Sequence, residues 1–314
     1  MTDSPLVSIV TPSYQQAAYL EQTLQSVLTQ DYSAMEYFVM DGGSTDGSVE
    51  IIRRYAPRLA GWVSEKDHGQ AEAVNKGWAR ARGEIIGWLN SDDLYAPGAV
   101  QRAVDAFAAH PEAALVFGDV RSIDAAGNTL NIMRFGHWSL TDLMRFNIIS
   151  QPGVFIRRRA LEQAGFLDLS YHFLLDHQLW LRVAQHGEMI YLPQEQASAR
   201  FHVAAKNLAQ AARFGQEAYR IVDWMQTQPA LAAPFAAHRA AIEAGAHRMN
   251  ARYLLDGGQP GAAFKAYARG LWRHPPTVLP ELHRMVFCLL SLLGLNRLGD
   301  LYRRLKARRF AGKK

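Results

Sequence analysis

Two adjacent carboxylates behind a short apolar run are the side chains of this sequence best suited to chemistry. Residues 85–89 (IIGWL) are almost uninterrupted by polar groups, and residues 90–93 (NSDD) follow at once. Because Asp92 and Asp93 repel one another and lose hydration when partly buried, a cation or the hydroxyls of a ligand would stabilise them. Their hard oxygens suit Mg²⁺ or Mn²⁺ bridged to a diphosphate better than Zn²⁺. The alternative is a turn in which an aspartate caps a helix before Pro97.

A buried strand must position this pair, and three earlier strands also end in polar residues. Apolar or β-branched runs predict strands over 7–11, 37–40, 61–64 and 85–89, with helices between them. Pro12 cannot continue a hydrogen-bonded ladder, so it marks the end of the first strand. Alternating strands and helices indicate an α/β sheet, in which ligands bind at the carboxyl ends of the strands. Four polar clusters therefore meet at one edge: Thr11, Asp41, residues 65–67 and residues 90–93.

Composition limits the classes of protein that this chain can belong to. Its 314 residues predict about two domains, and its 49% hydrophobic and 20% charged residues are ordinary for a globular protein. The single cysteine, Cys288, excludes an internal disulfide, and we expect no N-terminal signal. Neither GxGxxG nor GxxxxGK[ST] is present, so a nucleotide would be held without a dinucleotide fingerprint or a P-loop.

Several ordered stretches resemble glycosyltransferase family 2. They are TPSYQQAAYLEQTLQSVLTQDY, VMDGGSTDGS and SEKDHGQAEAVNKGWARARGEIIGWLNSDD, and the likeness continues through QPGVFIRRRALEQAGFLD and LLDHQLWLRVAQHG to about His202. The resemblance implies an α/β protein with the GT-A fold, a three-layer α/β/α sandwich, over residues 1–203. Its nucleotide-binding half would cover about 1–119 and its acceptor half about 120–203. Residues 204–314 would form a helical C-terminal extension.

The resemblance also gives roles to individual residues. Asp41 would accept a hydrogen bond from the nucleotide base, Asp92 would face the ribose or diphosphate, and Asp93 would hold Mg²⁺ or Mn²⁺. The acidic motif begins with Asn90 where relatives have an aspartate, so we expect one fewer charge near the ribose. The remaining nucleotide-sugar contacts that the resemblance implies are Thr11, Pro12, Tyr14, Asp67, Asn75 and Ser91.

Three further residues are candidates for the site, and two of them, His202 and Asp119, also have a structural interpretation. His202 would approach the metal or the diphosphate, or else be a neutral histidine of the core or of a loop. Gln151 matches an acceptor-side loop of the family. Asp119 would either orient a substrate or support a turn.

Asp176 is the candidate catalytic base that the resemblance implies. It lies in LLDHQLWLRV, where Leu175, Leu179 and Val183 form the buried stripe of a helix that begins near the aspartate. The exposed N–H groups and the macrodipole of a first helical turn favour an ionised carboxylate, which can accept the proton of a sugar hydroxyl. The structural alternative is a helix cap. Many relatives have acidic residues at the positions of Leu175 and Gln178, so acceptor contacts transfer less directly.

The C-terminal third combines an apolar stripe with a basic tail. The stripe consists of Leu279, Leu282, Val286, Leu289 and Leu293. Residues 297–314 contain eight basic residues and one acidic residue, whereas the whole chain is only +5, so the body is not basic and nucleic acid is not an expected partner. Residues 278–314 therefore predict an in-plane helix on an anionic membrane surface. The alternative is a helix packed on the body with a solvated basic end.

The sequence as a whole predicts a metal-dependent, inverting glycosyltransferase. We expect it to move a sugar from a nucleotide sugar, with UDP-sugars favoured, to a saccharide acceptor that is lipid-linked. We expect the protein itself to lie in the cytoplasm or peripherally on the inner face of the plasma membrane. One alternative is a nonenzymatic nucleotide-sugar sensor or scaffold, which would tolerate loss of Asp176. The other is a sugar nucleotidyltransferase, but TPSYQQAAYL lacks the Gly-rich, basic loop that such enzymes carry after the first strand.

Overall fold

The computed structural model describes residues 4–201 and 211–295, and the chain divides into two compact units. Unit 1 consists of Met1–Leu143 and Ile148–His202, and unit 2 of Met144–Asn147 and Val203–Lys314. The short segment Met144–Asn147 thus belongs with the C-terminal helices, although the sequence pattern placed it inside the N-terminal domain. Each unit has its own buried residues and is described by itself.

A mixed sheet of nine strands forms the centre of unit 1. Its order is β3-β2-β1-β4-β8-β6-β9-β5, and β7 pairs with β6. The pairs β1–β2, β1–β4 and β2–β3 are parallel, whereas β8 is antiparallel to both β4 and β6. The strands are β1 (Val7–Ser13), β2 (Met35–Asp41), β3 (Gly61–Ser64), β4 (Ile85–Trp88), β5 (Leu94–Tyr95), β6 (Ala113–Asp124), β7 (Thr129–Met133), β8 (Val154–Arg157) and β9 (Glu188–Phe201).

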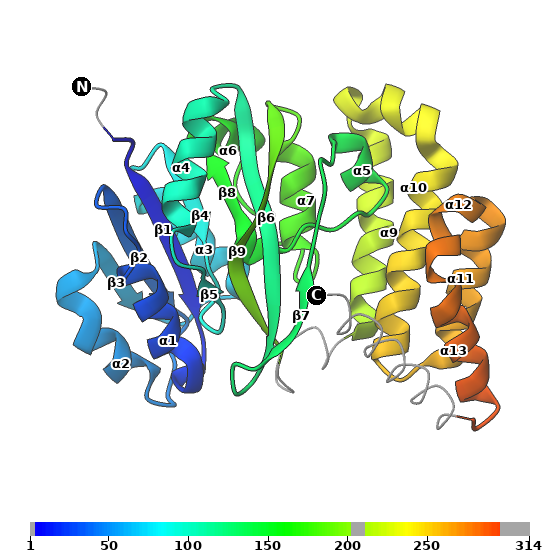
Figure 1. The fold of residues 1–314 in the computed structure, drawn as a ribbon, viewed down its shortest axis with the longest axis horizontal. Helices are drawn as coiled ribbons and strands as arrows, with labels where there is room; N and C mark the ends of the chain where they lie inside the picture. Colours follow the sequence, from blue (N-terminus) through cyan, green and yellow to red (C-terminus); the bar gives the residue numbers. More distant parts are fainter. Residues whose placement is uncertain (1–3, 202–210, 296–314) are drawn as a thin grey trace. The chain divides into compact units, whose positions relative to one another are not determined.

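Helices cover both faces of this sheet, so unit 1 has three layers (Figure 1). Side chains alternate between the faces of a strand: Ile9 packs in one cluster with residues of α1, α2 and α4, whereas Val10 lies against Gly77 of α3. The helices of unit 1 are α1 (Ala17–Leu28), α2 (Ser48–Tyr55), η1 (Ala56–Arg58), α3 (Gln70–Arg80), α4 (Ala99–Ala109), α5 (Leu140–Met144, of which Met144 already belongs to unit 2), η2 (Gln151–Gly153), α6 (Arg158–Ala164) and α7 (Leu175–Val183).

The four predicted strands are confirmed, with one difference at Pro12. Strand β1 continues through Pro12 to Ser13, where it still pairs with β2. The pairing of β1 with β4 ends earlier, at Val10 and Trp88. Beyond Val10 the strand therefore has a neighbour on one side only, and a proline that lacks an N–H is tolerated at such an edge.

The close packing of α3 on β1 gives a test of the sheet layer. A Cβ at Gly77 would overlap the side chain of Val10. At an open helical position, Gly→Ala stabilises a protein by about 0.5–1 kcal/mol. We expect Gly77→Ala instead to lower the free energy of unfolding by about 2 kcal/mol, because overpacking forces backbone and side chains to shift.

Urea unfolding of the Gly77→Ala, Val10→Ala and double variants measures this effect. Val10→Ala removes the methyl groups that a Cβ at position 77 would meet, so the double variant should lose less stability than the two single variants together. A stabilising Gly77→Ala would show that α3 does not pack as closely as described.

The described part of unit 2 is helical, and helices that follow one another in the sequence pack together. Helix α10 packs against both α9 and α11, and α13 packs against α11. No helix within residues 4–201 and 211–295 combines the length and apolarity needed to cross a membrane. The helices are α9 (Ala211–Thr227), α10 (Pro229–Asp256), α11 (Pro260–Arg273), α12 (Pro275–Val278), η3 (Leu279–Glu281) and α13 (Leu282–Leu292).

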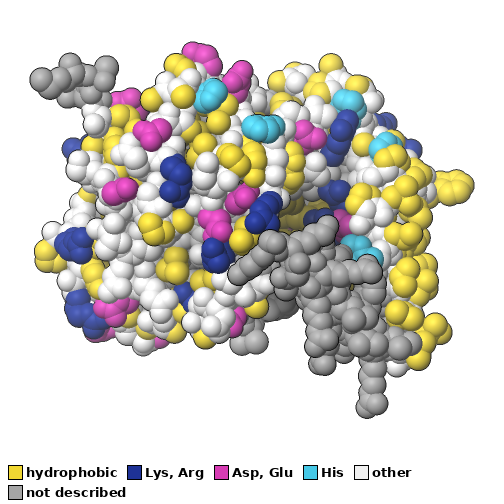
Figure 2. Space-filling model, in the orientation of Figure 1, with side chains coloured by type: hydrophobic (Ala, Val, Ile, Leu, Met, Phe, Trp, Pro, Cys, Tyr) yellow, Lys and Arg dark blue, Asp and Glu magenta, His cyan; other side chains and the backbone are white. Residues whose placement is uncertain are grey.

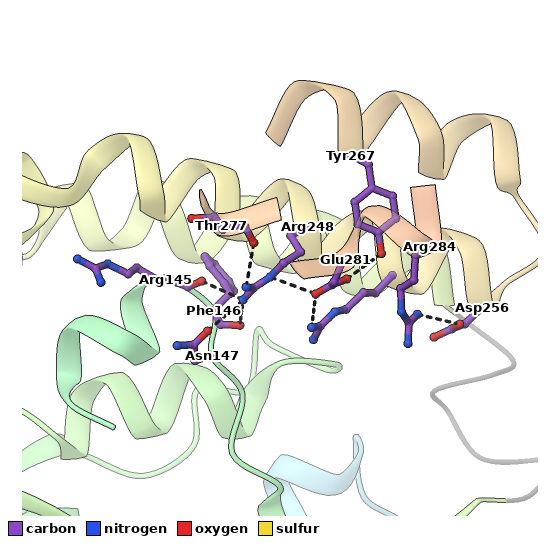
Figure 3. A network of polar contacts seen from close by, with 10 residues as sticks. Arg145, Phe146, Asn147, Arg248, Asp256, Tyr267, Thr277, Glu281 and Arg284 are labelled. Carbon is purple, nitrogen blue, oxygen red and sulfur yellow. Dashed lines mark hydrogen bonds and ion pairs between the residues drawn. The ribbon is translucent and has the colours of Figure 1, made fainter. Parts of the chain in front are cut away.

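A buried polar network joins α10, α11 and η3 (Figure 3). Glu281 is 6% exposed; its carboxylate pairs with Arg252, lies 3.6 Å from Arg248 and accepts a 2.9 Å hydrogen bond from the Tyr267 hydroxyl. Arg248 also donates to the carbonyl oxygen of Phe146 at 2.9 Å, which explains why the segment Met144–Asn147 groups with unit 2. The network therefore fixes η3, and with it the start of α13.

The apolar stripe predicted from the sequence lies on the exposed side of α13. Leu282, Val286, Leu289 and Leu293 are between 43% and 71% exposed, whereas Cys288 is fully buried. Figure 2 shows hydrophobic side chains gathered over α11 and α13. The helix thus packs on unit 2 through its other side.

Candidate active site

The register of the parallel strands brings the predicted polar ends together at one edge of the sheet. Ser13 is opposite Asp41, and Asp41 is opposite Ser64. On the other side of β1, Val10 is opposite Trp88, two residues before the acidic motif. The loops that follow β1, β2, β3 and β4 therefore leave neighbouring positions on the carboxyl edge, where α/β sheets bind ligands.

Asp41 organises the loop that follows β2. The residue is buried, and its Oδ2 accepts hydrogen bonds from the Ser64 hydroxyl at 2.7 Å and from the N–H groups of Gly43 and Ser44 at 3.1 and 2.9 Å. Its Oδ1 accepts from the Ser44 hydroxyl at 2.6 Å. Protein donors thus reach both carboxylate oxygens, and the expected contact with a nucleotide base stays a prediction.

Asp67 and Gly42 show how closely the loops after β2 and β3 approach. A Cβ at Gly42 would lie 2.7 Å from Oδ2 of Asp67, so only glycine leaves room for this carboxylate. The other oxygen of Asp67 accepts a 2.9 Å hydrogen bond from the N–H of Gly69. Asp67 is half-buried and is held beside the loop that Asp41 organises.

The three predicted contacts at the end of β1 differ in exposure. Thr11 has no exposed surface, and its hydroxyl pairs with the Tyr37 hydroxyl at 2.8 Å. Pro12 is also buried, whereas Tyr14 is 61% exposed. Tyr14 is thus the accessible residue of the three, and the contacts of all three with a nucleotide stay predictions.

The acidic pair after β4 divides into an inner and an outer carboxylate. Asp93 is 5% exposed; its Oδ1 accepts from the N–H of Arg200 at 2.9 Å and its Oδ2 from the Asn90 amide at 3.2 Å. Asp92 is half-buried, and Ser91, the residue before it, is buried. Burial, followed by the charge of Asp92, raises the pKa of Asp93 well above its usual range.

This pair fits a divalent cation by its chemistry. Two adjacent carboxylates supply hard oxygens, and a cation would offset both the burial and the charge of Asp92 that raise the pKa of Asp93. Within the described ranges no group of three or more His, Cys, Asp and Glu side chains could hold a metal by itself. The predicted ligand His202 lies outside the described residues.

Asn90 explains why an amide can begin the acidic motif. Its Oδ1 accepts hydrogen bonds from the Trp88 indole at 2.9 Å and from the Gln70 amide at 2.6 Å. Its Nδ2 donates to Asp93. An aspartate at this position could accept the first two bonds but could not donate the third. Asn90 therefore links the first residue of α3 to the inner carboxylate.

Arg200 is a residue of this site that the sequence analysis missed. It is 5% exposed, and its guanidinium donates to the carbonyl oxygens of Asp92 and Asp124 at 2.9 and 3.3 Å and to Gln22 Oε1 at 2.8 Å. It also lies over the ring of Tyr19, 4.7 Å from the centroid. A buried arginine in a strand needs such acceptors. The only sign of this in the sequence was an arginine within the short stretch ARFHV.

The predicted base, Asp176, lies in the first turn of α7. It is half-buried between the buried residues Leu175 and His177, and its Oδ1 accepts the N–H of His177 at 2.7 Å. Burial lowers the pKa of His177 to about 4, so this imidazole is neutral at neutral pH and adds no positive charge beside Asp176. The residue thus has the position of a helix-terminal carboxylate, and its role as base stays a prediction.

Two side chains hold the segment that leads into α7. Asn75 of α3 donates to the carbonyl oxygen of Leu167 at 2.9 Å and accepts its N–H at 3.0 Å. Arg182 donates to the carbonyl oxygens of Gly165 and Phe166 at 2.9 and 2.8 Å and to the side chain of Gln178. Asn75, predicted to contact the nucleotide, therefore has both ends of its amide paired with a backbone segment.

The two acceptor-side candidates are both buried. Gln151 donates to the carbonyl oxygen of Trp88 and so ties η2 to the end of β4, while its buried Oε1 has no hydrogen-bond partner among the residues that the structure describes. Asp119 accepts from the Tyr191 hydroxyl at 2.7 Å and from the N–H of Phe135 at 3.2 Å. Burial, with Asp119 adding to it, raises the pKa of Tyr191 to about 12. Asp119 thus has two protein donors, and its role in orienting a substrate stays a prediction.

A three-layer unit with an acidic pair at the carboxyl edge of its parallel strands is the architecture of the GT-A fold. The family model "Glycosyl transferase family 2" matches residues 8–165, half of the chain, and the chain belongs to this family. It is 32% identical over 186 residues to the O-antigen biosynthesis protein RfbC of Myxococcus xanthus. The matched stretch covers 58% of this chain and 14% of that protein. The chain spans less than a third of the length of the first curated relatives it matches.

Solved structures share the fold over most of the chain. The mannosyltransferase PcManGT from Pyrobaculum calidifontis, in complex with GDP-Man and Mn²⁺, has a TM-score of 0.63 and 22% identity, covering 96% of this chain and 88% of that one. S. aureus TarS 1-349, in complex with UDP-GlcNAc, has a TM-score of 0.58 and 16% identity, covering 95% and 92%. The predicted fold class and family are thereby confirmed.

Proposed function

We propose that unit 1 transfers a sugar from a nucleotide sugar, with UDP-sugars favoured, to a saccharide acceptor in polysaccharide biosynthesis. The observation that carries this proposal is the convergence of Tyr14, Asp41, Asp67 and Asp92 on the carboxyl edge of β1 to β4. Family membership supports the reaction type, and the names of a relative and of two structural neighbours support the substrate class. The preference for UDP over GDP is tested by nucleotide-sugar binding.

The mechanism that we propose is a single displacement with inversion. The oxygen of the acceptor hydroxyl attacks the anomeric carbon while Asp176 accepts the proton of that hydroxyl. The bond between the anomeric carbon and the nucleoside diphosphate breaks in the same step. Mg²⁺ or Mn²⁺, when bound, would supply positive charge to the diphosphate leaving group. Asp92 and Asp93 would hold it, with Asp92 as the outer ligand because Asp93 already accepts two protein hydrogen bonds.

Binding of nucleotide sugars tests the donor half of this proposal. UDP-, GDP- and dTDP-sugars are compared by calorimetry or thermal shift with and without Mn²⁺. We expect tighter binding with Mn²⁺ for one of these bases, and no detectable binding of any of them would contradict the proposal.

Two variants separate the inner from the outer carboxylate. Asp92→Asn should remove most of the Mn²⁺-dependent gain in affinity and leave the unfolding midpoint nearly unchanged, because the residue is half-buried. Asp93→Asn replaces one buried acceptor with a donor, so it should also lower the free energy of unfolding by about 1–3 kcal/mol. If Asp92→Asn keeps the full Mn²⁺ effect, Asp92 is not a ligand.

We also propose that the acceptor is lipid-linked and that transfer takes place at the inner face of the plasma membrane. Its support is the exposed apolar side of α13 and the basic composition of residues 297–314. Comparing transfer to a saccharide carried on a polyprenyl diphosphate with transfer to the same saccharide free in solution tests it. Equal rates with the two acceptors would contradict it.

A further inference from the structure

The exposed side of α13 is continuous and apolar. Residues 282, 286, 289 and 293 recur at steps of three and four, which places them on one side of a helix. Residues 282–295 contain no aspartate or glutamate. The α13 face, as we name it, consists of Leu279, Leu282, Val286, Leu289, Leu292 and Leu293, each at least 43% exposed.

The rest of unit 2 holds this face outward. Cys288, on the opposite side of α13, is buried in a cluster with residues of α10 and α11. Glu281, immediately before the helix, is fixed by Arg252 and Tyr267 (Figure 3). Arg284 pairs with Asp256 at 3.5 Å. Turning the leucines inward would break these ion pairs and expose Cys288, so their exposure is built into the fold.

The sequence next to the α13 face favours one kind of occupant. Arg297 follows Leu295 by two residues, a reach of roughly 7 Å. From Arg297 to Lys314 the chain carries eight basic residues and one acidic residue. An anionic lipid surface offers both an apolar layer and negative charge. A second copy of the chain would instead bring two strongly basic segments together, which repel one another.

We propose that the α13 face docks in the plane of an anionic lipid bilayer, with residues 297–314 providing electrostatic attraction. At eleven residues, α13 is well short of the ~20 residues that span a bilayer, so it lies along the surface. The proposal holds whether or not unit 1 transfers a sugar.

Sedimentation of the full chain with lipid vesicles tests this inference. We expect the protein to pellet with vesicles that contain phosphatidylglycerol, to pellet much less with phosphatidylcholine alone, and to be released by salt. Leu282→Gln, Leu289→Gln and Leu293→Gln combined should weaken binding on the order of tenfold or more, because these side chains enter the acyl boundary. Changing Arg303 and Arg304 to Gln should weaken it by about fivefold for each charge removed.

The matched control removes two exposed leucines elsewhere. Leu130 and Leu169 in unit 1 are 58% and 54% exposed, and changing both to Gln should leave vesicle binding unchanged. Circular dichroism checks that the variants are folded, and nucleotide binding by unit 1 is measured separately. Three outcomes would overturn the proposal: no pelleting of the full chain, equal binding by the triple leucine variant, or a dimer in solution that this variant dissociates without any vesicle binding.

Discussion

Asp176→Asn should lower the turnover number by about a thousandfold while leaving the affinity for the nucleotide sugar nearly unchanged. General acid–base catalysis contributes roughly 10²–10⁴-fold to rates, and an amide cannot take the proton of the acceptor hydroxyl. The fold should tolerate the change, because the amide oxygen of Asn can still accept the N–H of His177 as Oδ1 of Asp176 does at 2.7 Å. Release of the nucleoside diphosphate in the presence of acceptor measures the rate.

A second aspartate in a first helical turn provides the control. Asp142 in α5 accepts the N–H and the hydroxyl of Ser139 at 2.9 and 2.8 Å, which is a capping role. Asp142→Asn should therefore keep turnover near the wild-type value. Near-normal transfer by purified Asp176→Asn would rule out the base assignment. If wild type binds the donor but transfers nothing to any acceptor, the nonenzymatic sensor becomes the better interpretation.

The strands and the edge at which their polar ends meet could be predicted from the sequence because both depend on local pattern. Residues 85–88 form β4 and are all buried, and a polar motif that follows such a strand so closely has to lie at its carboxyl end. The same logic placed Asp41 and Asp67 correctly at this edge. What the pattern could not show is which side chains the fold itself uses there.

Several of the predicted contact residues turned out to have structural partners far along the chain. The Thr11 hydroxyl pairs with Tyr37, and the Asn75 amide pairs with Leu167. Asp119 accepts from Tyr191. Such pairs join positions 26 to 92 residues apart, so neither periodicity nor a resemblance to a family reveals them. Arg200, which connects β9 to the acidic motif across 108 residues, was missed for the same reason.

The C-terminal helices show a different limit of sequence pattern. The apolar stripe of α13 was recognised, but periodicity gives only the side of the helix that is apolar and not the direction in which that side faces. The direction depends on Glu281, whose partners Arg248, Arg252 and Tyr267 come from two other helices. A charged residue beside a leucine stripe reads as solvated in the sequence, and only its burial shows that it anchors the helix.

Glu281→Gln is accordingly expected to be the most destabilising conservative change in unit 2, lowering its free energy of unfolding by about 3 kcal/mol. Removing one partner of a buried ion pair leaves the other charge uncompensated, and Arg248 and Arg252 would then share no carboxylate. Glu243→Gln is the matched control, because Glu243 also bridges two arginines, Arg239 and Arg273, but at the surface. Its expected effect is below about 1 kcal/mol.

The same carboxylate makes the stability of unit 2 depend on pH. Burial alone would raise the pKa of Glu281, but the hydrogen bond and charge of Arg252 and the charge of Arg248 outweigh it and hold the pKa below the usual 4.5. A lowered pKa stabilises the folded state above pH 4.5, and this contribution is lost as the pH falls through the lower, folded value. Glu281→Gln should therefore unfold with a weaker pH dependence in this acid range.

Hydrogen exchange read by mass spectrometry locates the effect within the chain. In Glu281→Gln, amides of α10, α11 and α13 should exchange faster, while those of β1, β2 and β4 in unit 1 keep their wild-type rates, because each unit has its own core. The difference in exchange between variant and wild type should disappear below the folded pKa of Glu281, where the wild-type carboxyl group is also uncharged. Equal protection of α13 in the variant and in wild type at neutral pH would show that something other than this network holds the α13 face outward.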